Sequence, residues 1–309
     1  MFDSKKSVLQ EVRFSFLNKT NKKLFIKRDD LIDEFVSGNK WRKLKYNIEH
    51  ACQLGKRGIL TFGGAYSNHL LATAAACHNH DLNSIGIVRG EELTIESNEM
   101  LQKCSDFGME LLFISRTEYA NRIESSFLNY YKSEFSDYYL VPEGGANYYG
   151  IIGCQEIMLE AGFDFDRVFI AQGTTATSCG VLTSLKNGTR LSAVPVLKGF
   201  DTFGEMKKLL SYAGFEQEWV DDLLNLVDIH NESHFGGYGK YDASLLELMQ
   251  RFYQETAIPL DPVYTGKLIH ALCEYCLATS EIAEKILIVH TGGITGGLHV
   301  SRSEGYVFN

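Results

Sequence analysis

One basic segment of the chain is Ser37-Gly38-Asn39-Lys40-Trp41-Arg42-Lys43-Leu44, which follows an apolar, strand-like run at residues 24–27 and opens a helical pattern. A lysine amine that acts as a nucleophile near neutral pH needs a lowered pKa, and nearby cations and partial burial both lower it. Because Arg42, Lys43 and Lys45 flank Lys40, this lysine is a candidate nucleophile. Taken alone, the segment also fits an ordinary basic helix that Ser37 or Asn39 caps.

Short apolar runs of strand-forming residues alternate with helical patterns along most of the chain. The predicted strands are residues 24–27, 58–62, 84–88, 110–114, 138–141, 167–171, 193–197, 226–229 and 285–289. Helical patterns lie between them, for example over residues 68–77 and 151–160. This alternation favours an α/β fold with open, twisted, mostly parallel sheets flanked by helices.

Bulk composition narrows the class of protein. The 309 residues are 45% hydrophobic and 22% charged, which favours a folded chain of about two domains. The net charge of -9 argues against a nucleic-acid partner, since that needs a basic surface. The N-terminus has no apolar leader, and no apolar run approaches the ~20 residues of a membrane span. We therefore expect a cytoplasmic protein with no membrane contact.

The cysteines and clustered histidines carry no metal signature. Seven cysteines, an odd number, argue against a disulfide framework and fit a reducing compartment. Cys273 and Cys276 fall inside a predicted helix, and His78 and His80 fall at the end of another. We expect structural thiols and a helix end, with no metal at either place.

A glycine-rich turn follows the strand predicted at residues 58–62. It reads Gly63-Gly64-Ala65-Tyr66-Ser67-Asn68-His69 and leads into a predicted helix. Backbone N–H groups at such a turn suit a carboxylate, and Ser67 and Asn68 offer a hydroxyl and an amide to a ligand. A plain turn with a Ser or Asn helix cap is the alternative.

A second turn, after the strand predicted at residues 167–171, is rich in threonine. It reads Gly173-Thr174-Thr175-Ala176-Thr177-Ser178. Small residues let backbone approach an anion, and hydroxyls add donors, so we expect a phosphate site here. It has neither the Lys of a Walker A loop nor the G-x-G-x-x-G of a dinucleotide site. A purely structural turn is the alternative.

Two further turns contain candidate polar side chains. They read Asp261-Pro262-Val263-Tyr264-Thr265-Gly266-Lys267 and His290-Thr291-Gly292-Gly293. Tyr264 could donate or accept a proton, and Thr291 could hydrogen-bond a ring nitrogen. Because ligands of open α/β sheets bind at the carboxyl ends of strands, these turns could converge on one crevice. A buried tyrosine and an ordinary turn are the alternatives.

Together these motifs resemble, in order and spacing, the 1-aminocyclopropane-1-carboxylate deaminase and D-cysteine desulfhydrase family. The resemblance runs from about residue 24 to residue 297, and it rests on Ser-Gly-Asn-Lys-x-Arg-Lys-Leu, Ser-Asn-His and Asp-Pro-Val-Tyr-x-Gly-Lys. It implies a pyridoxal 5'-phosphate (PLP) enzyme of fold type II, the tryptophan-synthase-β type. We expect a large PLP-binding domain over residues 1–44 and 145–309, with a smaller α/β domain inserted at residues 45–144.

The resemblance also implies roles for residues of this chain. Lys40 would hold PLP as a Schiff base, Asn68 would bind its phenolic oxygen, and Thr291 would face its ring nitrogen. The phosphate would bind the loop Gly173, Thr174, Thr175, Ala176 and Thr177. Residues on the substrate side would be Ser67, Asn68, His69, Tyr66, Thr265, Tyr238 and Tyr264, with Ser67 and the two tyrosines in catalytic roles.

The choice of substrate follows from departures within that resemblance. Tyr66 replaces the family's usual Gln and would reshape the substrate pocket. Thr265 and Thr291 stand where the cyclopropane deaminases have Glu and Leu, which favours β-elimination from a small D-amino acid such as D-cysteine. Open alternatives are the cyclopropane deaminase and a D-serine-type dehydratase. Two alternatives belong to other functional classes, namely a nucleotide-binding module and a PLP-binding protein without catalysis. The resemblance implies a homodimer.

Overall fold

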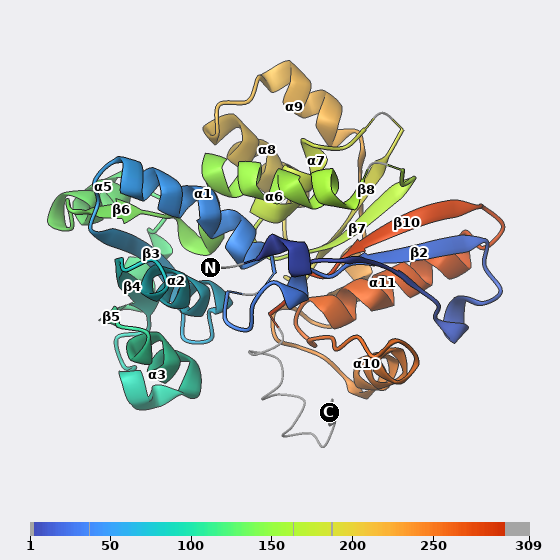
Figure 1. The fold of residues 1–309 in the computed structure, drawn as a ribbon, viewed down its shortest axis with the longest axis horizontal. Coiled ribbons are helices and arrows are strands. Elements are labelled where there is room, and N and C mark those ends of the chain that lie inside the picture. Colours follow the sequence, from blue (N-terminus) through green and yellow to red (C-terminus); the bar gives the residue numbers. More distant parts are fainter. Residues whose placement is uncertain (1–2, 37, 163, 187, 294–309) are drawn as a thin grey trace.

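Two β-sheets and the helices that cover them make up the described part of the chain, residues 3–36, 38–162, 164–186 and 188–293 of a computed structural model (Figure 1). The smaller sheet and its helices lie to the left in Figure 1, and the larger sheet lies to the right. The predicted α/β fold with two mostly parallel sheets is confirmed.

The larger sheet has six strands in the order β1-β2-β10-β7-β8-β9. Their bounds are β1 (Leu9–Val12), β2 (Lys22–Lys27), β10 (Glu284–Val289), β7 (Arg167–Gln172), β8 (Arg190–Pro195) and β9 (Val227–Ile229). Every neighbouring pair is parallel except β1 and β2. The sequence did not predict β1, because this edge strand buries only Val12 and so lacks an apolar run.

The smaller sheet has four parallel strands in the order β5-β4-β3-β6. They are β5 (Met109–Ile114), β4 (Asn83–Arg89), β3 (Gly58–Gly64) and β6 (Tyr138–Leu140). With these, each of the nine predicted strands is present, and the ends differ by at most a few residues.

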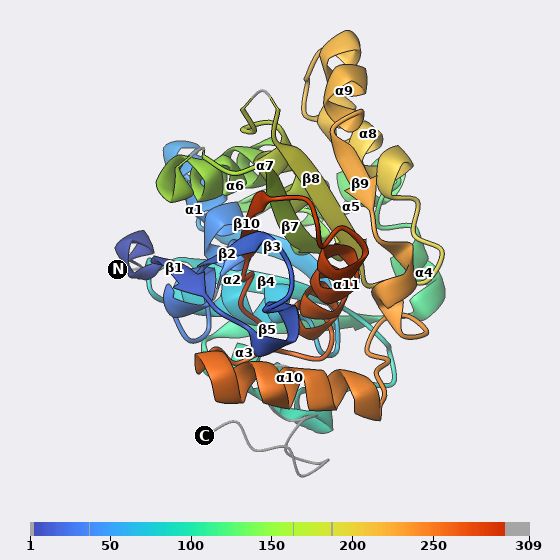
Figure 2. The same cartoon turned by 90° about the vertical axis from the view of Figure 1, so that its right-hand side faces the viewer.

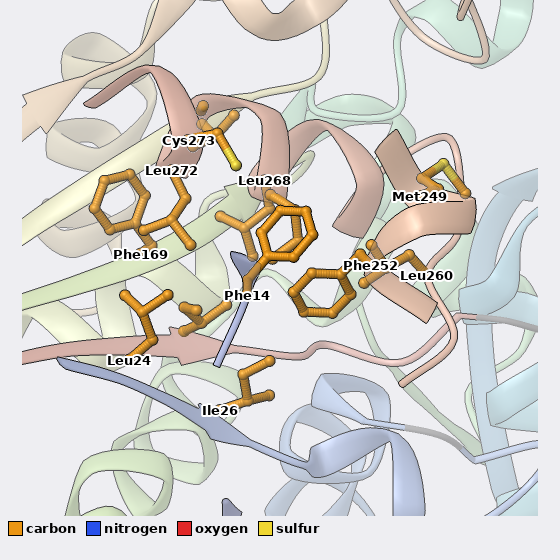
Figure 3. Close-up of a cluster of buried hydrophobic side chains, with 14 of the residues drawn as sticks. Phe14, Leu24, Ile26, Phe169, Met249, Phe252, Leu260, Leu268, Leu272 and Cys273 are labelled. Atoms are coloured by element: carbon orange, nitrogen blue, oxygen red, sulfur yellow. The ribbon is translucent and has the colours of Figure 1, made fainter. Parts of the chain in front are cut away.

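Alternate residues of the central strand β7 point to opposite faces of the larger sheet. Val168 and Ile170 pack under α6 (Tyr148–Ala161), α7 (Ala176–Leu182), α8 (Thr202–Tyr212) and α9 (Gln217–Leu224). Phe169 and Ala171 face α10 (Ala243–Thr256) and α11 (Thr265–Ala278). Figure 3 shows this second core, in which Phe169 lies beside Leu272 and Phe252 lies beside Leu260. Figure 2 shows α10 and α11 on the side of the molecule away from α6 and α7.

The smaller sheet is covered in the same way. Ile59 packs with α1 (Asn39–Gln53) and α2 (Asn68–His78), and α3 (Glu99–Asp106) extends that layer. Its neighbour Leu60 faces α4 (Arg116–Ala120) and α5 (Ser125–Glu134). The predicted domain boundary after residue 44 falls within α1, and the boundary after residue 144 falls in the 3-10 turn Glu143–Gly145. This division into domains stays a prediction.

Membrane-spanning helices and metal-binding clusters were searched for in the described residues. Within them, no helix is long and apolar enough to cross a membrane, and no cluster of three or more His, Cys, Asp or Glu side chains could hold a metal ion. Cys273 and Cys276 are buried in α11, and α2 ends at His78.

Candidate active site

Helix α1 begins at a tight contact with the turn that follows β10. Gly38 has φ of 62°, and a Cβ there would lie 2.0 Å from the carbonyl oxygen of Thr291, so only glycine fits. The Asn39 N–H donates to the same oxygen at 3.3 Å. Asn39 is the first residue of α1, and Gly38 stands at the N-cap position, so Asn39 is not the helix cap. Ser37, the other predicted cap, lies outside the described residues. These contacts place Lys40 next to the buried Thr291 turn.

The Lys40 amine is held in an environment that favours its neutral form. Its Nζ lies 2.6 Å from Asn39 Oδ1. Burial, followed by repulsion from Lys43, lowers the pKa of Lys40 to about 7. The predicted cause is only partly right, because of the three expected cations Lys43 alone lowers this pKa. Arg42 and Lys45 are paired with carboxylates elsewhere.

Arg42 faces away from Lys40 into a buried ionic network. Its guanidinium binds Asp29 with two hydrogen bonds of 2.8 and 3.0 Å and Glu160 with two more of 2.6 and 2.7 Å. Burial opposes the charge, but the bonds to Glu160 and Asp29 raise the pKa of Arg42. Glu160 also binds Lys27, and Lys45 binds Glu156 at 2.7 Å. This side of α1 fastens the helix to α6 and to the end of β2.

The threonine-rich loop between β7 and α7 lies against the start of α1. Asn39 Nδ2 donates to Thr177 Oγ1 at 2.8 Å, and Lys43 Nζ lies 3.3 Å from Thr174 Oγ1. Lys43 is buried, and burial lowers its pKa. A buried cation that lies beside a threonine hydroxyl, and has no carboxylate partner among the described residues, is suited to an anion such as phosphate.

Glycine at position 173 is required by a close packing contact. A Cβ at Gly173 would lie 2.9 Å from the Tyr264 ring. The other two loop residues, Thr175 and Ala176, are buried at the start of α7. All five predicted residues of the loop therefore lie at one β–α junction. Asn39 and Lys43 were not among the predicted site residues, although both stand in the same basic segment as Lys40.

Helix α2 starts with three predicted site residues. Ser67 caps it, and its Oγ accepts from Leu70 N at 3.3 Å. The Asn68 amide lies near the Thr291 turn, because a Cβ at Gly293 would be 3.2 Å from Asn68 Nδ2. Tyr66 precedes them and keeps 69% of its surface exposed, so its expected effect on a pocket stays a prediction.

His69 is buried, and one of its ring nitrogens has no hydrogen-bond partner within the described part of the chain. The Thr61 hydroxyl donates to Val141 O at 2.8 Å and therefore accepts from His69 Nε2 at 2.9 Å. This leaves Nδ1 as an acceptor for which the described residues provide no donor. Burial, then repulsion from Lys43 and Lys40, lowers the pKa of His69 to about 3, so the ring is neutral.

The turn before α11 positions Tyr264. The Asp261 carboxylate accepts from the N–H groups of Val263, Tyr264 and Thr265 at 2.7 to 3.0 Å. The Thr265 hydroxyl lies 2.7 Å from both Asp261 Oδ2 and Asp261 N. The predicted contact of Thr265 with substrate stays a prediction, and its hydroxyl is engaged by Asp261.

Tyr264 and Tyr238 come from separate turns and form an aromatic pair. Their ring centroids are 6.2 Å apart and their planes meet at 77°. Burial raises the pKa of Tyr264 well above its usual value, and interaction with Tyr238 adds to this. Buried Lys267 donates to the carbonyl oxygens of His234 at 2.8 Å and Gly237 at 2.7 Å, which holds the turn before Tyr238. Lys267 belongs to the predicted turn at residues 261–267, but no role was predicted for it.

A family described as "Pyridoxal-phosphate dependent enzyme" matches residues 9–292. The chain belongs to this family. The residues of the site fit a PLP enzyme, since they combine an amine of lowered pKa with a hydroxyl-lined loop and a buried cation beside it. The predicted cofactor and enzyme class are thus confirmed.

Relatives of this PLP enzyme carry two activity names. A protein of Pyrococcus horikoshii described as a candidate 1-aminocyclopropane-1-carboxylate deaminase is 31% identical over 89% of this chain and 86% of its own length. A bifunctional D-cysteine desulfhydrase/1-aminocyclopropane-1-carboxylate deaminase, mitochondrial, of Arabidopsis thaliana is 30% identical over 88% of this chain and 73% of its own. A solved structure of an ACC deaminase homologue matches with a TM-score of 0.78 and 25% identity, covering 98% of this chain and 94% of that one. The predicted family and fold type are confirmed.

Proposed function

We propose that this PLP enzyme deaminates a small D-amino acid by β-elimination, with D-cysteine as the favoured substrate. D-cysteine and water would give pyruvate, ammonia and hydrogen sulfide. The observation that carries the choice is the hydroxyl of Thr265, which stands directly after Tyr264 where the resemblance places a Glu in cyclopropane deaminases.

Lys40 is the proposed attachment point for the cofactor and the base that removes the α-proton. With a pKa of about 7, close to half of its amine is neutral at neutral pH, so it can attack a carbonyl or take a proton. When bound, PLP withdraws electrons from the substrate Cα. Lys43 would neutralise the phosphate, and the hydroxyls of Thr174 and Thr177 would orient it.

The remaining residues would bind the ring and the substrate. Asn68 is proposed to bind the phenolic oxygen and Thr291 to face the ring nitrogen, because the α2 start and the Thr291 turn meet there. Ser67 would meet the substrate carboxylate or leaving group. His69, with Tyr66, Tyr238 and Tyr264, would line the substrate side.

One carboxylate that acts on this site, that of Asp261, is not available as a base. Asp261 acts electrostatically on both Lys40 and Tyr264, but its two oxygens accept from three backbone N–H groups and the Thr265 hydroxyl. A cyclopropane substrate has no α-proton, so ring opening needs acid–base groups in places other than those that serve elimination. Hydroxyls cannot supply a carboxylate base near neutral pH.

Cyclopropane ring opening is the second candidate, because the Pyrococcus and Arabidopsis relatives carry that name. A substrate panel separates the candidates. The purified enzyme would be given D-cysteine, L-cysteine, D-serine and 1-aminocyclopropane-1-carboxylate, with the oxo-acid product identified by mass. We expect pyruvate from D-cysteine and little four-carbon oxo acid from the cyclopropane substrate. Efficient turnover of the cyclopropane acid with D-cysteine inert would overturn the proposal. A homodimer and a cytoplasmic location stay predictions.

A further inference from the structure

Asn39 makes side-chain contacts with both the proposed attachment lysine and the proposed phosphate loop. Its Oδ1 accepts from Lys40 Nζ at 2.6 Å, and its Nδ2 donates to Thr177 Oγ1 at 2.8 Å. Asn39 is 8% exposed, so water competes little for either bond. No other side chain of the described residues is hydrogen-bonded to the Lys40 amine.

We propose that Asn39 is a positioning residue, whose amide oxygen holds the Lys40 amine whenever the substrate has displaced it from the cofactor. The proposal rests on the proposed attachment of PLP to Lys40. The released amine must stay close to the reacting carbon, because it has to remove a proton and later reform its bond. An acceptor fixed beside it limits how far it can move.

The orientation of the amide follows from its two partners. A protonated lysine has donors and no acceptor, so the oxygen of Asn39 must face Lys40. Adjacent side chains of a helix do not normally face each other, so the Asn39 side chain has to fold back across the start of α1. The bond to Thr177 and the bond from Asn39 N to Thr291 O hold it there.

An amide, rather than a carboxylate, suits this role because a neutral acceptor favours the ammonium form far less than a negative charge does. Lys43 on the same helix lowers the pKa of Lys40, whereas Asp261 before α11 and Cys154 of α6 raise it less, and His69 of α2 is neutral. A carboxylate at position 39 would add a negative charge within hydrogen-bond distance. Such a charge would raise the pKa of Lys40 and remove most of the neutral amine.

The test replaces the amide by the isosteric carboxylate, Asn39→Asp, in the full-length protein. Its first measurement is the rate at which cofactor-stripped protein captures PLP between pH 5 and pH 10, followed by the absorbance of the lysine-bound cofactor. For the unaltered protein we expect a midpoint near pH 7, which is the pKa of Lys40. For Asn39→Asp we expect the midpoint to rise by about two units, and capture at pH 7 to fall about 50-fold.

A second variant, Asn39→Ala, removes the acceptor without adding charge. Here kcat should fall about tenfold or more, KM should change little, and the capture midpoint should not rise. Asn47→Asp is the matched control, because Asn47 is a buried asparagine of the same helix that binds Lys43 O and Asn147. This control should keep both kcat and KM of the unaltered protein. Any effect should appear only as a lower midpoint of thermal unfolding.

Two results would overturn the proposal. One is a capture midpoint that Asn39→Asp leaves within about 0.3 unit of the original, a shift too small for an added charge in contact with Lys40. The other is Asn39→Ala with unchanged kcat. Borohydride reduction of the unaltered holoenzyme keeps this test separate from the proposed function, since label on a lysine other than Lys40 would reject the attachment itself.

Discussion

The two sides of helix α1 carry the same kind of side chain and use it in opposite ways. On the side toward α6, Arg42 and Lys45 are matched by Asp29, Glu156 and Glu160. On the side toward the Gly173 loop, which is the proposed phosphate site, Lys40 and Lys43 have amide and hydroxyl partners instead. The paired cations have raised pKa values, and the unpaired ones have lowered pKa values.

The difference shows that neighbouring carboxylates decide what a cation in this helix does. A paired, buried guanidinium contributes to structure, because its removal leaves carboxylates without compensation. An unpaired, buried ammonium is ready to bind an anion or to lose its proton. The predictions below are ways to separate these two uses.

Lys40→Arg should give the largest effect on activity. The guanidinium keeps the charge but cannot lose its proton near neutral pH, so it can neither carry the cofactor nor act as a base. We expect loss of the absorption band of lysine-bound PLP and a fall in turnover of about 100- to 10,000-fold. Lys45→Arg, on the paired side, is the control and should keep both. Substantial turnover by Lys40→Arg would contradict the assignment.

Arg42→Leu should affect stability more than chemistry. The change leaves Asp29 buried without its partner, which costs about 3–5 kcal/mol of unfolding free energy. Urea unfolding measures this cost, and turnover per folded molecule should stay within about twofold. Arg190→Leu breaks a half-exposed pair with Asp228 and should cost about 1 kcal/mol or less. Equal costs for the two variants would show that burial does not distinguish these pairs.

Lys43→Gln should weaken the binding of the cofactor phosphate. Loss of a charge-assisted hydrogen bond of about 1.5–3 kcal/mol corresponds to a Kd about 10- to 150-fold higher. The pKa of Lys40 should also rise, because repulsion from Lys43 is removed, and less amine is then neutral at pH 7. Titration with PLP and with pyridoxal, which lacks the phosphate, separates the two effects. Equal weakening of both ligands would argue against a phosphate contact.

Ser67→Ala tests a residue that follows a strand of the smaller sheet, and it should cost less unfolding free energy than Arg42→Leu. We expect the yellow colour to remain and turnover to fall by at least about tenfold, with about 1 kcal/mol lost from the α2 cap. Absorbance and steady-state kinetics measure these together. Loss of PLP in this variant would place Ser67 on the cofactor side instead.

Most of the fold could be predicted from the sequence, because its central strands are continuous apolar runs between helical patterns. The run at residues 285–289 is an example, since β10 is buried between two parallel neighbours. The edge strand β1 could not be predicted, because three of its four residues keep some exposure and the pattern of burial is weak. Helix-flanked parallel sheets bury their strands on both faces, and that produces the clearest sequence signal.

The motifs of the candidate site could be predicted from the sequence, but the ion-pair and hydrogen-bond partners of their side chains could not. Residue types after predicted strands made Lys40, Ser67 and the Gly173 loop candidates, and the resemblance to a known family gave them their predicted roles. The positions of Asp29 and Glu160 in space decide which cations are paired. Both carboxylates bind Arg42, and among the described residues neither binds Lys43. Likewise, the sequence could not show that the Thr265 hydroxyl binds Asp261, because the residue type does not tell a free hydroxyl from one that is already hydrogen-bonded.

The most direct test of the central claim is borohydride reduction of the holoenzyme, followed by proteolysis and mass analysis of the peptide that carries the cofactor. The account predicts a single label, on the amine of Lys40, whose pKa is about 7. It also predicts that Lys43, which is buried in the same helix, stays unlabelled. A label on Lys43, or on any lysine outside α1, would contradict the account.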